Sequence, residues 1–379
     1  MGFTAKTGSR GLFIASTGQH IGKTTTSLGL FSGLLKRASR TAFIKPVGQE
    51  HVDVGAGVRV DKDSILFRLQ FDLQDSWEAM SPVLFPRGFT RDYIDGTVET
   101  GSLEQKIVAA YRSLQVQADW VLAEGTGHVG VGSIADLDNA RVAQLLGTPM
   151  VMIASGGLGS AFDSLALNKY ACDRLNVPIA GVILNRVLPE KREMIIDYMG
   201  RALGRWGVPL LGAIPYDTIL GHPCMDDFER LFEAPILTGE THRYRHFDQV
   251  RLVATSNEVY EQHMEPRQLT ITPARREDII ETTLVKLDEA RRSGMDPEPL
   301  PGMILTGRYE PDEAVLRRLA AADVPMIYAP VNTFVAMQMI SRHTAKIRVE
   351  DTEKVSRAIH LVETHVDLDA LMDRVDAVV

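Results

Sequence analysis

Residues 16–26 read S-T-G-Q-H-I-G-K-T-T-T, and they constrain the fold of this chain more than any other stretch. The apolar run Leu12-Phe13-Ile14-Ala15 precedes them, and residues 24–35 have the apolar spacing of a helix. A strand, a glycine-containing loop, Gly-Lys-Thr and a helix form the layout of a phosphate-binding P-loop. Thr17 stands where the motif G-x-x-x-x-G-K-[ST] has its first glycine, and Gly18 follows one residue later. The alternative interpretation is a chance Gly-Lys-Thr at the start of a helix.

The P-loop interpretation predicts that the ligand carries phosphate groups. Backbone N–H groups of such a loop converge on an anion, and the dipole of the following helix adds to the attraction. Lys23 would reach the β- and γ-phosphates, and the Thr24 hydroxyl would hold Mg²⁺. We therefore predict ATP and Mg²⁺ as ligands. The residues expected to surround the nucleotide are Thr17, Gly18, Gln19, His20, Ile21, Gly22, Lys23, Thr24 and Thr25.

Strand and helix patterns alternate from the P-loop to about residue 217. Apolar runs typical of buried strands occur at residues 40–44, 119–123, 149–154, 179–184 and 209–214. Stretches with helical spacing occur at residues 103–117, 139–146, 161–175 and 191–206, and residues 81–101 form an irregular excursion. This alternation predicts an α/β fold with a parallel sheet flanked by helices on both faces.

Charged residues stand at or near the ends of two predicted strands. Lys45 follows the strand at residues 40–44, and in an open α/β sheet this end of a strand borders the ligand crevice. Glu124 follows the strand at residues 119–123, where a nucleotide-bound Mg²⁺ finds an acidic partner; a structural ion pair is the alternative. Asp61 and Asp63 precede another apolar run, and either one could cap a helix there.

The composition excludes several classes of protein. Hydrophobic residues make up 45% and charged residues 24% of the 379 residues, as in a globular protein long enough for two domains. The net charge of −8 indicates no general nucleic-acid-binding surface. Two cysteines, Cys172 and Cys224, cannot form a disulfide framework, so we expect a reducing, cytoplasmic location. No apolar run approaches the roughly 20 residues of a membrane span, and residues 1–11 contain no signal core.

A second alternating pattern begins at Val250. Strand-like runs occur at residues 252–254, 269–272, 303–306 and 326–328, and helical runs at 278–292, 312–322, 333–341 and 354–364. We therefore predict a P-loop domain at residues 1–220, a boundary segment at 221–249, and a smaller α/β domain with C-terminal helices at 250–379. His242 and His246 stand four residues apart in the boundary segment. Because their surroundings are polar and contain no third ligand, we interpret this stretch as a solvated face rather than a metal site.

The motifs of the first half together resemble one family. They are S-T-G-Q-H-I-G-K-T-T, Lys45-Pro46-Val47, Asp63, Glu124-Gly125, Asn185-Arg186 and Ile214-Pro215. With these motifs, residues 11–217 resemble the dethiobiotin synthetase-like P-loop fold. That fold is shared with the ATP-binding part of cobyrinic acid a,c-diamide synthase and with the N-terminal region of long phosphotransacetylases.

The resemblance implies a role for each matching residue. Lys23 would bind the triphosphate, and Lys45 would contact the γ-phosphate or the reacting acid, so these are the predicted catalytic residues. Asn185 would read the edge of the adenine, with Pro215 close by. The implied metal ligands are Thr24, Asp63 and Glu124.

The second half resembles the DRTGG domain in three blocks. They are Pro273-Ala274-Arg275-Arg276-Glu277-Asp278-Ile279-Ile280, Ile304-Leu305-Thr306-Gly307 and Asn332-Thr333-Phe334. This domain also follows the P-loop region in long phosphotransacetylases, so the resemblance covers residues 11–365. Arg275, Arg276 and Asp278 would either contact a small ligand or another subunit, or form an ordinary charged helix start.

The domain order favours a nucleotide-binding regulatory or accessory protein with slow ATPase activity, similar to the N-terminal half of a long phosphotransacetylase. The alternative is an ATP-dependent ligase or amide synthase that phosphorylates a carboxylate or carbamate. A glutamine-dependent amide synthase would need an activated cysteine, and neither Cys172 nor Cys224 lies in a glycine-rich elbow. The resemblance also implies a homo-oligomer. The expected partners are a nucleotide and a small-molecule acid, as substrate or effector, with no nucleic acid and no membrane.

Overall fold

The computed structural model describes residues 8–98, 100–294, 300–343 and 345–378, and the chain divides into two compact units. Unit 1 comprises Met1–Tyr216 and Thr352–Val379, and unit 2 comprises Asp217–Asp351. Unit 2 is therefore inserted into unit 1. This differs from the division predicted from the sequence pattern, because residues 352–379 belong to the first unit rather than the second.

Unit 1 is built on a parallel sheet of six strands, which confirms the predicted fold class. The strands are β1 (Arg10–Ser16), β2 (Thr41–Ile44), β7 (Trp120–His128), β8 (Met150–Ser155), β9 (Ile179–Val187) and β10 (Leu210–Pro215). They lie in the order β10-β9-β8-β1-β7-β2. Because all neighbouring strands are parallel, their carboxyl ends meet at one edge of the sheet, and the P-loop follows β1 at that edge.

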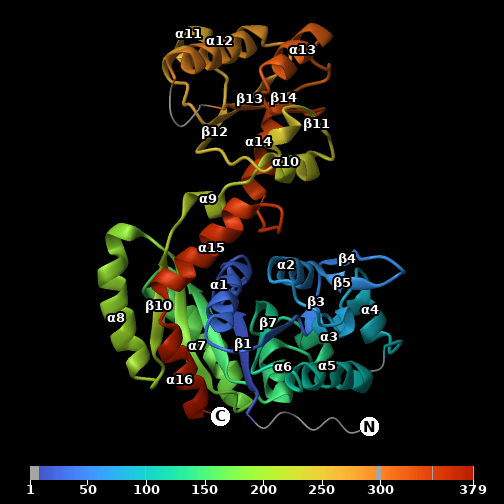
Figure 1. The fold of residues 1–379 in the computed structure, drawn as a ribbon, viewed down its shortest axis with the longest axis vertical. Helices are drawn as coiled ribbons and strands as arrows, with labels where there is room; N and C mark the ends of the chain where they lie inside the picture. The colour runs from blue at the N-terminus through green and yellow to red at the C-terminus, as the bar shows by residue number, and fades with distance from the viewer. Residues whose placement is uncertain (1–7, 99, 295–299, 344, 379) are drawn as a thin grey trace. The chain divides into compact units, whose positions relative to one another are not determined.

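Helices cover both faces of this sheet (Figure 1). One face packs against α5 (Thr100–Gln115), α6 (Asn139–Leu146), α7 (Gly159–Arg174) and α8 (Arg192–Gly204). The other face carries α1 (Lys23–Leu35), α2 (Lys62–Gln70), α15 (Thr352–His365) and α16 (Leu368–Val378). Phe13 and Ala15 of β1 pack in the first of these cores, and Leu12 and Ile14, which alternate with them, are equally buried. This burial on both faces explains why the strands read as nearly continuous apolar runs.

Aromatic packing fixes α2 beside the end of β2. The rings of Phe43 in β2 and Phe67 in α2 are stacked, with their centroids 3.8 Å apart. Phe31 of α1 meets Phe67 edge-on at 5.4 Å. Each such pair contributes about 0.5–1.5 kcal/mol beyond its burial. The cluster therefore holds the start of α2, which carries Asp63, close to the P-loop helix and to β2.

Helix α15 packs closely along the P-loop helix α1. A Cβ atom added to Gly29 of α1 would lie 2.2 Å from the Cβ of Val362 in α15, so the two backbones approach where α1 has no side chain. Beside this contact, the Ser32 hydroxyl donates to Glu363 Oε1 at 2.8 Å, and the Lys36 ammonium pairs with the same carboxylate at 2.6 Å. Helices α15 and α16 also pack on β9 and β10. The two helices cover the part of the sheet surface that α1 leaves open, which is why residues 352–379 belong to unit 1.

Between β2 and α5 the chain forms a series of short elements. They are β3 (Val47–Gly48), β4 (His51–Asp53), β5 (Arg59–Asp61), α3 (Trp77–Met80), β6 (Val83–Leu84) and α4 (Phe89–Ile94), in addition to α2. Strand β3 pairs with β6, and β4 pairs with β5. Part of this segment is the excursion predicted for residues 81–101, of which residue 99 lies outside the described residues.

Unit 2 is a smaller α/β unit, and its sheet has the strand order β11-β15-β14-β13-β12. Its strands are β11 (Ile236–Thr238), β12 (Gln249–Leu252), β13 (Gln268–Pro273), β14 (Gly302–Thr306) and β15 (Met326–Ala329). Its helices are α9 (Thr218–Gly221), α10 (Met225–Phe232), α11 (Asn257–Gln262), α12 (Glu277–Ser293), α13 (Glu313–Ala321) and α14 (Thr333–Arg342). The predicted boundary segment thus supplies α10 and β11. Phe228 of α10 and Ile236 of β11 are part of the core of unit 2.

Within the described ranges, no helix is long and apolar enough to cross a membrane.

Alanine in place of Gly29 would push α15 away from α1. We expect Gly29→Ala to lower the free energy of unfolding of unit 1 by about 1–3 kcal/mol. The control is Gly200→Ala in α8, where an added Cβ meets nothing within 4 Å. It should raise stability by about 0.5–1 kcal/mol through helix propensity. Urea unfolding followed by tryptophan fluorescence measures both effects, because Trp77, Trp120 and Trp206 all lie in unit 1. Equal effects would contradict the close packing.

Candidate functional site

The loop between β1 and α1 has the backbone of an anion-binding turn. Gly22 caps α1 with φ 97°, a left-handed conformation that favours glycine. A Cβ at this position would also lie 2.2 Å from Asn185 Nδ2, so no larger residue fits without movement. His20 has φ 56°, which is uncommon for a residue with a side chain. The loop is therefore held in a specific shape with the N-terminus of α1 behind it, as a phosphate site requires.

Lys23 begins α1, and its side chain returns across the loop to the strand ends. Its Nζ donates to the carbonyl of Gly127 at 2.7 Å and to the hydroxyl of Ser16 at 3.1 Å. The Ser16 hydroxyl in turn donates to the carbonyl of Gly18 at 2.6 Å. Burial, with the nearby Lys45 ammonium, lowers the pKa of Lys23 to about 8. The only acceptors of Lys23 that the structure records are neutral oxygens, so a phosphate group would be a stronger partner.

Four of the predicted residues converge beside the P-loop. Lys45 directly follows β2 and Glu124 lies within β7, whereas Thr24 and Asp63 lie in the first turns of α1 and α2. The Lys45 ammonium contacts Asp63 Oδ2 at 2.6 Å and Glu124 Oε1 at 3.0 Å. It also lies 3.3 Å from the carbonyl oxygen of Gly125. The Thr24 hydroxyl donates to the same Glu124 Oε1 at 3.0 Å. Residues from four separate elements thus share one small polar cluster beside the P-loop.

The structure separates the roles of Asp61 and Asp63. Asp61 is the N-cap of α2, and its Oδ1 accepts the backbone N–H of Asp63 at 3.0 Å. Its Oδ2 accepts the N–H of Gln49 at 3.1 Å. Asp63 in the first turn of α2 is the residue whose carboxylate reaches Lys45. Of the two carboxylates that could cap this helix, Asp61 does so, which leaves Asp63 for the cluster.

Burial and the central ammonium together set the charges of the cluster. Lys45 and Glu124 are almost completely buried, at 4% and 0% exposure. Burial alone would lower the pKa of Lys45, but Asp63 and Glu124 outweigh it and raise this pKa above its usual value. Burial works to raise the pKa of Asp63, yet its ion pair with Lys45 lowers it overall. For Glu124, burial raises the pKa and the Lys45 ammonium opposes that shift. Lys45 is therefore a cation held by two carboxyl groups.

The same cluster fits a divalent cation that also binds phosphate. Glu124 Oε2 is buried and has no hydrogen-bond partner among the described residues, so one carboxylate oxygen is free to act as a ligand. Thr24 uses its hydroxyl proton on Glu124, which leaves the oxygen lone pairs available. In the described part of the chain, no group of three or more His, Cys, Asp and Glu side chains could hold a metal by itself. Two carboxylates and a hydroxyl suit Mg²⁺, which usually keeps waters and substrate phosphates as its other ligands.

Asn185 lies against the P-loop, where its side-chain amide is already bonded. Its Nδ2 donates to the carbonyl of Ile21 at 2.8 Å, and its Oδ1 accepts the backbone N–H of Arg186 at 2.9 Å. The assignment of Asn185 to the adenine edge, which the resemblance implies, stays a prediction; in this structure its side chain contacts the phosphate loop. Pro215 is the last residue of β10 and pairs with Val187, so it lies at the same edge of the sheet.

Three further groups at this edge were assigned no role from the sequence, although one of them, Ser16, begins the P-loop motif. They are the hydroxyl of Ser16, the carbonyl of Gly127 and the side chain of Asn139. Asn139 Nδ2 donates to the carbonyls of Thr126 and His128, at 2.9 and 2.8 Å. It thereby holds the end of β7 on both sides of Gly127. A serine as the last residue before the loop is the only sequence signal for any of these groups.

Among the described residues of unit 2, the histidines and Cys224 belong to no group that could hold a metal ion. His242 pairs with Asp323 at 2.9 Å, and His246 pairs with Asp351 at 3.0 Å. His246 is buried, so the interpretation of residues 241–246 as a solvated face is wrong for this residue. His222 Nδ1 bonds the carbonyl of Phe247, and buried Cys224 is the N-cap residue of α10. These contacts are structural.

The charged residues at the start of α12 pair with their neighbours. Arg275 pairs with Asp312 at 2.9 Å, and Arg276 pairs with Asp278 at 2.8 Å. Arg276 is the N-cap residue of α12, and Glu277 and Asp278 occupy the first turn of the helix. These contacts agree with the interpretation as a charged helix start.

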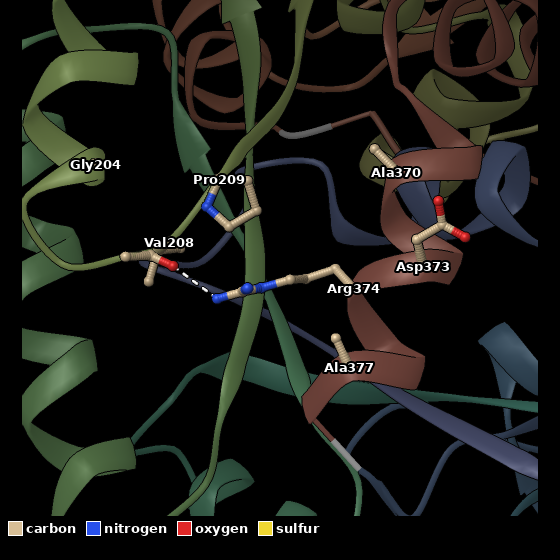
Figure 2. Close-up of a pocket in the computed structure, with 8 residues that line it drawn as sticks. Gly204, Val208, Pro209, Ala370, Asp373, Arg374 and Ala377 are labelled. Atoms are coloured by element: carbon tan, nitrogen blue, oxygen red, sulfur yellow. Dashed lines mark hydrogen bonds between the residues drawn. The ribbon is translucent and has the colours of Figure 1, made fainter.

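A hollow of about 550 Å³ in unit 1 lies at the opposite edge of the sheet (Figure 2). It is lined by the end of α8, the residues that lead into β10, and one side of α16. Arg374 crosses it and donates to the carbonyl of Gly207 at 2.7 Å. Its remaining lining is largely apolar and includes Val208, Pro209, Ala370 and Ala377. The hollow shares no residue with the P-loop cluster, so it is not the site that the motifs predict.

Comparison with known proteins matches each part of the chain to a family. Residues 10–223 match the AAA domain (AAA_26), and residues 228–343 match the DRTGG domain. The phosphate acetyltransferase of Nitratidesulfovibrio vulgaris is 26% identical over 97% of this chain and 52% of its own length. That of Synechocystis is 26% identical over 96% of this chain and 51% of its own length. The chain spans about half the length of these curated relatives, and it matches the N-terminal half of long phosphotransacetylases.

Solved structures resemble the chain only in part. The structure of apo McdA from Cyanthece covers 56% of this chain and 87% of its own, with 16% identity and a TM-score of 0.38. A likeness at this level carries no functional argument.

The environment of Lys23 predicts an amine that titrates far below the usual range for lysine. Because burial and the Lys45 charge favour the neutral form, we expect a midpoint of about 8, against about 10.4 for an unperturbed lysine. Lys23 would be protonated below this pH and neutral above it. NMR titration of ¹³C-labelled lysines measures the midpoint, with Lys23→Ala to assign the signal. Lys45→Met should raise the midpoint, because it removes the neighbouring charge. A midpoint near 10 in the unsubstituted protein would contradict the prediction.

Proposed function

The chain belongs to the AAA domain family, and from this premise we propose that unit 1 binds ATP together with Mg²⁺ at the P-loop. The observation that carries the proposal is the convergence of Lys23, Thr24, Lys45, Asp63 and Glu124 at the carboxyl edge of the sheet. Two ammonium groups and the N-terminus of α1 would hold the phosphates. The carboxylates and the Thr24 hydroxyl would hold the metal.

The same groups could stabilise phosphoryl transfer. In that reaction the protein mainly positions the γ-phosphate and neutralises the charge that develops on it. Lys45 is suited to this task because it is buried beside the expected metal position and keeps its charge. Slow hydrolysis of ATP is therefore part of the proposal.

We further propose that this part of the protein acts as a regulatory or accessory nucleotide sensor. The relatives that carry the name phosphate acetyltransferase are about twice as long as the region matched here, and the match runs through both domains of this chain. The chain re-enters unit 1 from unit 2 through α15, which packs along α1. Helix α1 carries Lys23 and Thr24 in its first turn. A structural change at the nucleotide site would therefore pass through the packing of α1 on α15 to the chain segment that joins α15 to unit 2.

Removal of the Lys23 ammonium should greatly weaken nucleotide binding without unfolding unit 1. We expect Lys23→Ala to weaken ATP affinity on the order of 100-fold, because a charge-assisted contact to phosphate is lost. Isothermal titration calorimetry with Mg²⁺·ATP measures the affinity, and circular dichroism checks the fold. Lys169→Ala is the control, since Lys169 pairs with Asp173 on the outer side of α7. Unchanged affinity in Lys23→Ala would remove the P-loop from the proposed function.

The rate of ATP hydrolysis in the presence of small acids distinguishes a sensor from a ligase. We expect slow release of ADP and phosphate, at a rate that small diacids, diamino acids and acetyl phosphate do not change. Steady-state assays of the purified protein with Mg²⁺·ATP and each compound measure this. A many-fold increase with one acid would contradict the sensor proposal. It would instead favour a ligase that activates a carboxylate by phosphorylation, for which the lysines and carboxylates are equally suited.

A further inference from the structure

The Lys45 ammonium occupies the space between the two carboxylates that would hold the metal. Its Nζ lies 2.6 Å from Asp63 Oδ2 and 3.0 Å from Glu124 Oε1. All three side chains are mostly shielded from water, with side-chain exposures of 5%, 19% and 0% respectively. The two oxygens are therefore already neutralised by a cation of the protein itself.

A divalent cation and this ammonium cannot both take these oxygens. Glu124 Oε2 is the buried oxygen of these two carboxylates that has no partner among the described residues, and one such oxygen is a poor site for Mg²⁺. A second cation within a few ångströms of Nζ would also be repelled strongly in these buried surroundings. Metal binding therefore requires Lys45 to move or to be absent.

The charge balance indicates what would allow Lys45 to move. Without ligands, Lys23 and Lys45 face Asp63 and Glu124, so the positive and negative charges of these four groups match. A divalent cation alone would leave positive charge in excess. A triphosphate brings the missing negative charge and offers the ammonium groups a stronger acceptor than a carbonyl. The four groups are thus balanced without ligands, and a triphosphate more than offsets the positive charge that a divalent cation adds.

We propose that Lys45 is an internal counter-ion that competes with the divalent cation for Asp63 and Glu124. The metal consequently enters only together with the phosphates, which take over the Lys45 ammonium. Lys23 does not share this role, because its recorded acceptors are Gly127 and Ser16 and not a carboxylate. This inference rests on the proposed nucleotide site, but the competition itself concerns the nucleotide-free protein and can be measured there.

The test is Mn²⁺ binding to the nucleotide-free full chain, followed by the electron paramagnetic resonance signal of free Mn²⁺. We expect Lys45→Met to bind one Mn²⁺ at least on the order of tenfold more tightly than the unsubstituted protein. The matched control is Lys62→Met. Lys62 is next to Asp63 in the chain and its ammonium pairs with Glu50, so its removal changes the local charge while Lys45 keeps its contacts with Asp63 and Glu124. Unchanged or weaker binding in Lys45→Met, or equal tightening in Lys62→Met, would overturn the proposal.

A second variant covers the case in which Lys45→Met does not fold, since it leaves two buried carboxylates without a counter-ion. Lys45→Gln retains a hydrogen-bond donor and removes the charge. We expect Mn²⁺ to raise the thermal unfolding midpoint of this variant more than that of the unsubstituted protein. No difference between the two shifts would also overturn the proposal. If the unsubstituted protein does not bind Mg²⁺·ATP, the proposed function fails, whereas the Mn²⁺ comparison still decides the competition.

Discussion

A parallel sheet that is apolar on both sides must be covered on both sides, and unit 1 is organised by this requirement. Helices α5 to α8 cover one face with chain that lies between the strands. The other face has α1 and α2 but no crossover helix over β9 and β10, because the connections to these strands run on the opposite side. The chain meets the requirement by returning after unit 2, so that α15 and α16 pack there. Because α15 packs beside α1 on this face, the two helices approach each other closely, and α1 has a glycine, Gly29, at the point of contact.

The polar cluster at the P-loop follows from the same sheet. Parallel strands end at one edge, so β2, β1 and β7 bring Lys45, the P-loop and Glu124 together although they are far apart in the chain. Charged groups buried there need partners, because an unpaired charge in such surroundings is costly. In this structure the Lys45 ammonium pairs with Asp63 and Glu124. Under the competition proposed above, these groups would exchange partners when a ligand binds.

The sequence pattern allowed much of this site to be predicted, and it failed for identifiable physical reasons. The strand ends and the Gly-Lys-Thr motif are local signals, and they located Lys23 at the start of α1 and Lys45 directly after β2. Glu124 was expected after its strand but lies within β7, which continues to His128. The choice between Asp61 and Asp63 was open, because both positions are compatible with a helix start and only the packing of α2 on β2 separates them. His246 looked solvated because its neighbours are polar. Its partner, Asp351, is more than a hundred residues away in the chain, and no local pattern contains that pairing.

By itself, the sequence determined the alternation of strands and helices, the parallel sheet and the phosphate loop, since each depends on periodicity or on residues close together in the chain. Only the tertiary structure decided that residues 352–379 belong to unit 1, because sheet coverage is a property of the assembled layers. It also decided that the amide of Asn185 holds the carbonyl of Ile21, and that Lys45 lies between Asp63 and Glu124. These contacts join segments that only the folded sheet brings within a few ångströms. A local pattern can name the residues in such contacts, but it cannot say which partner each one meets.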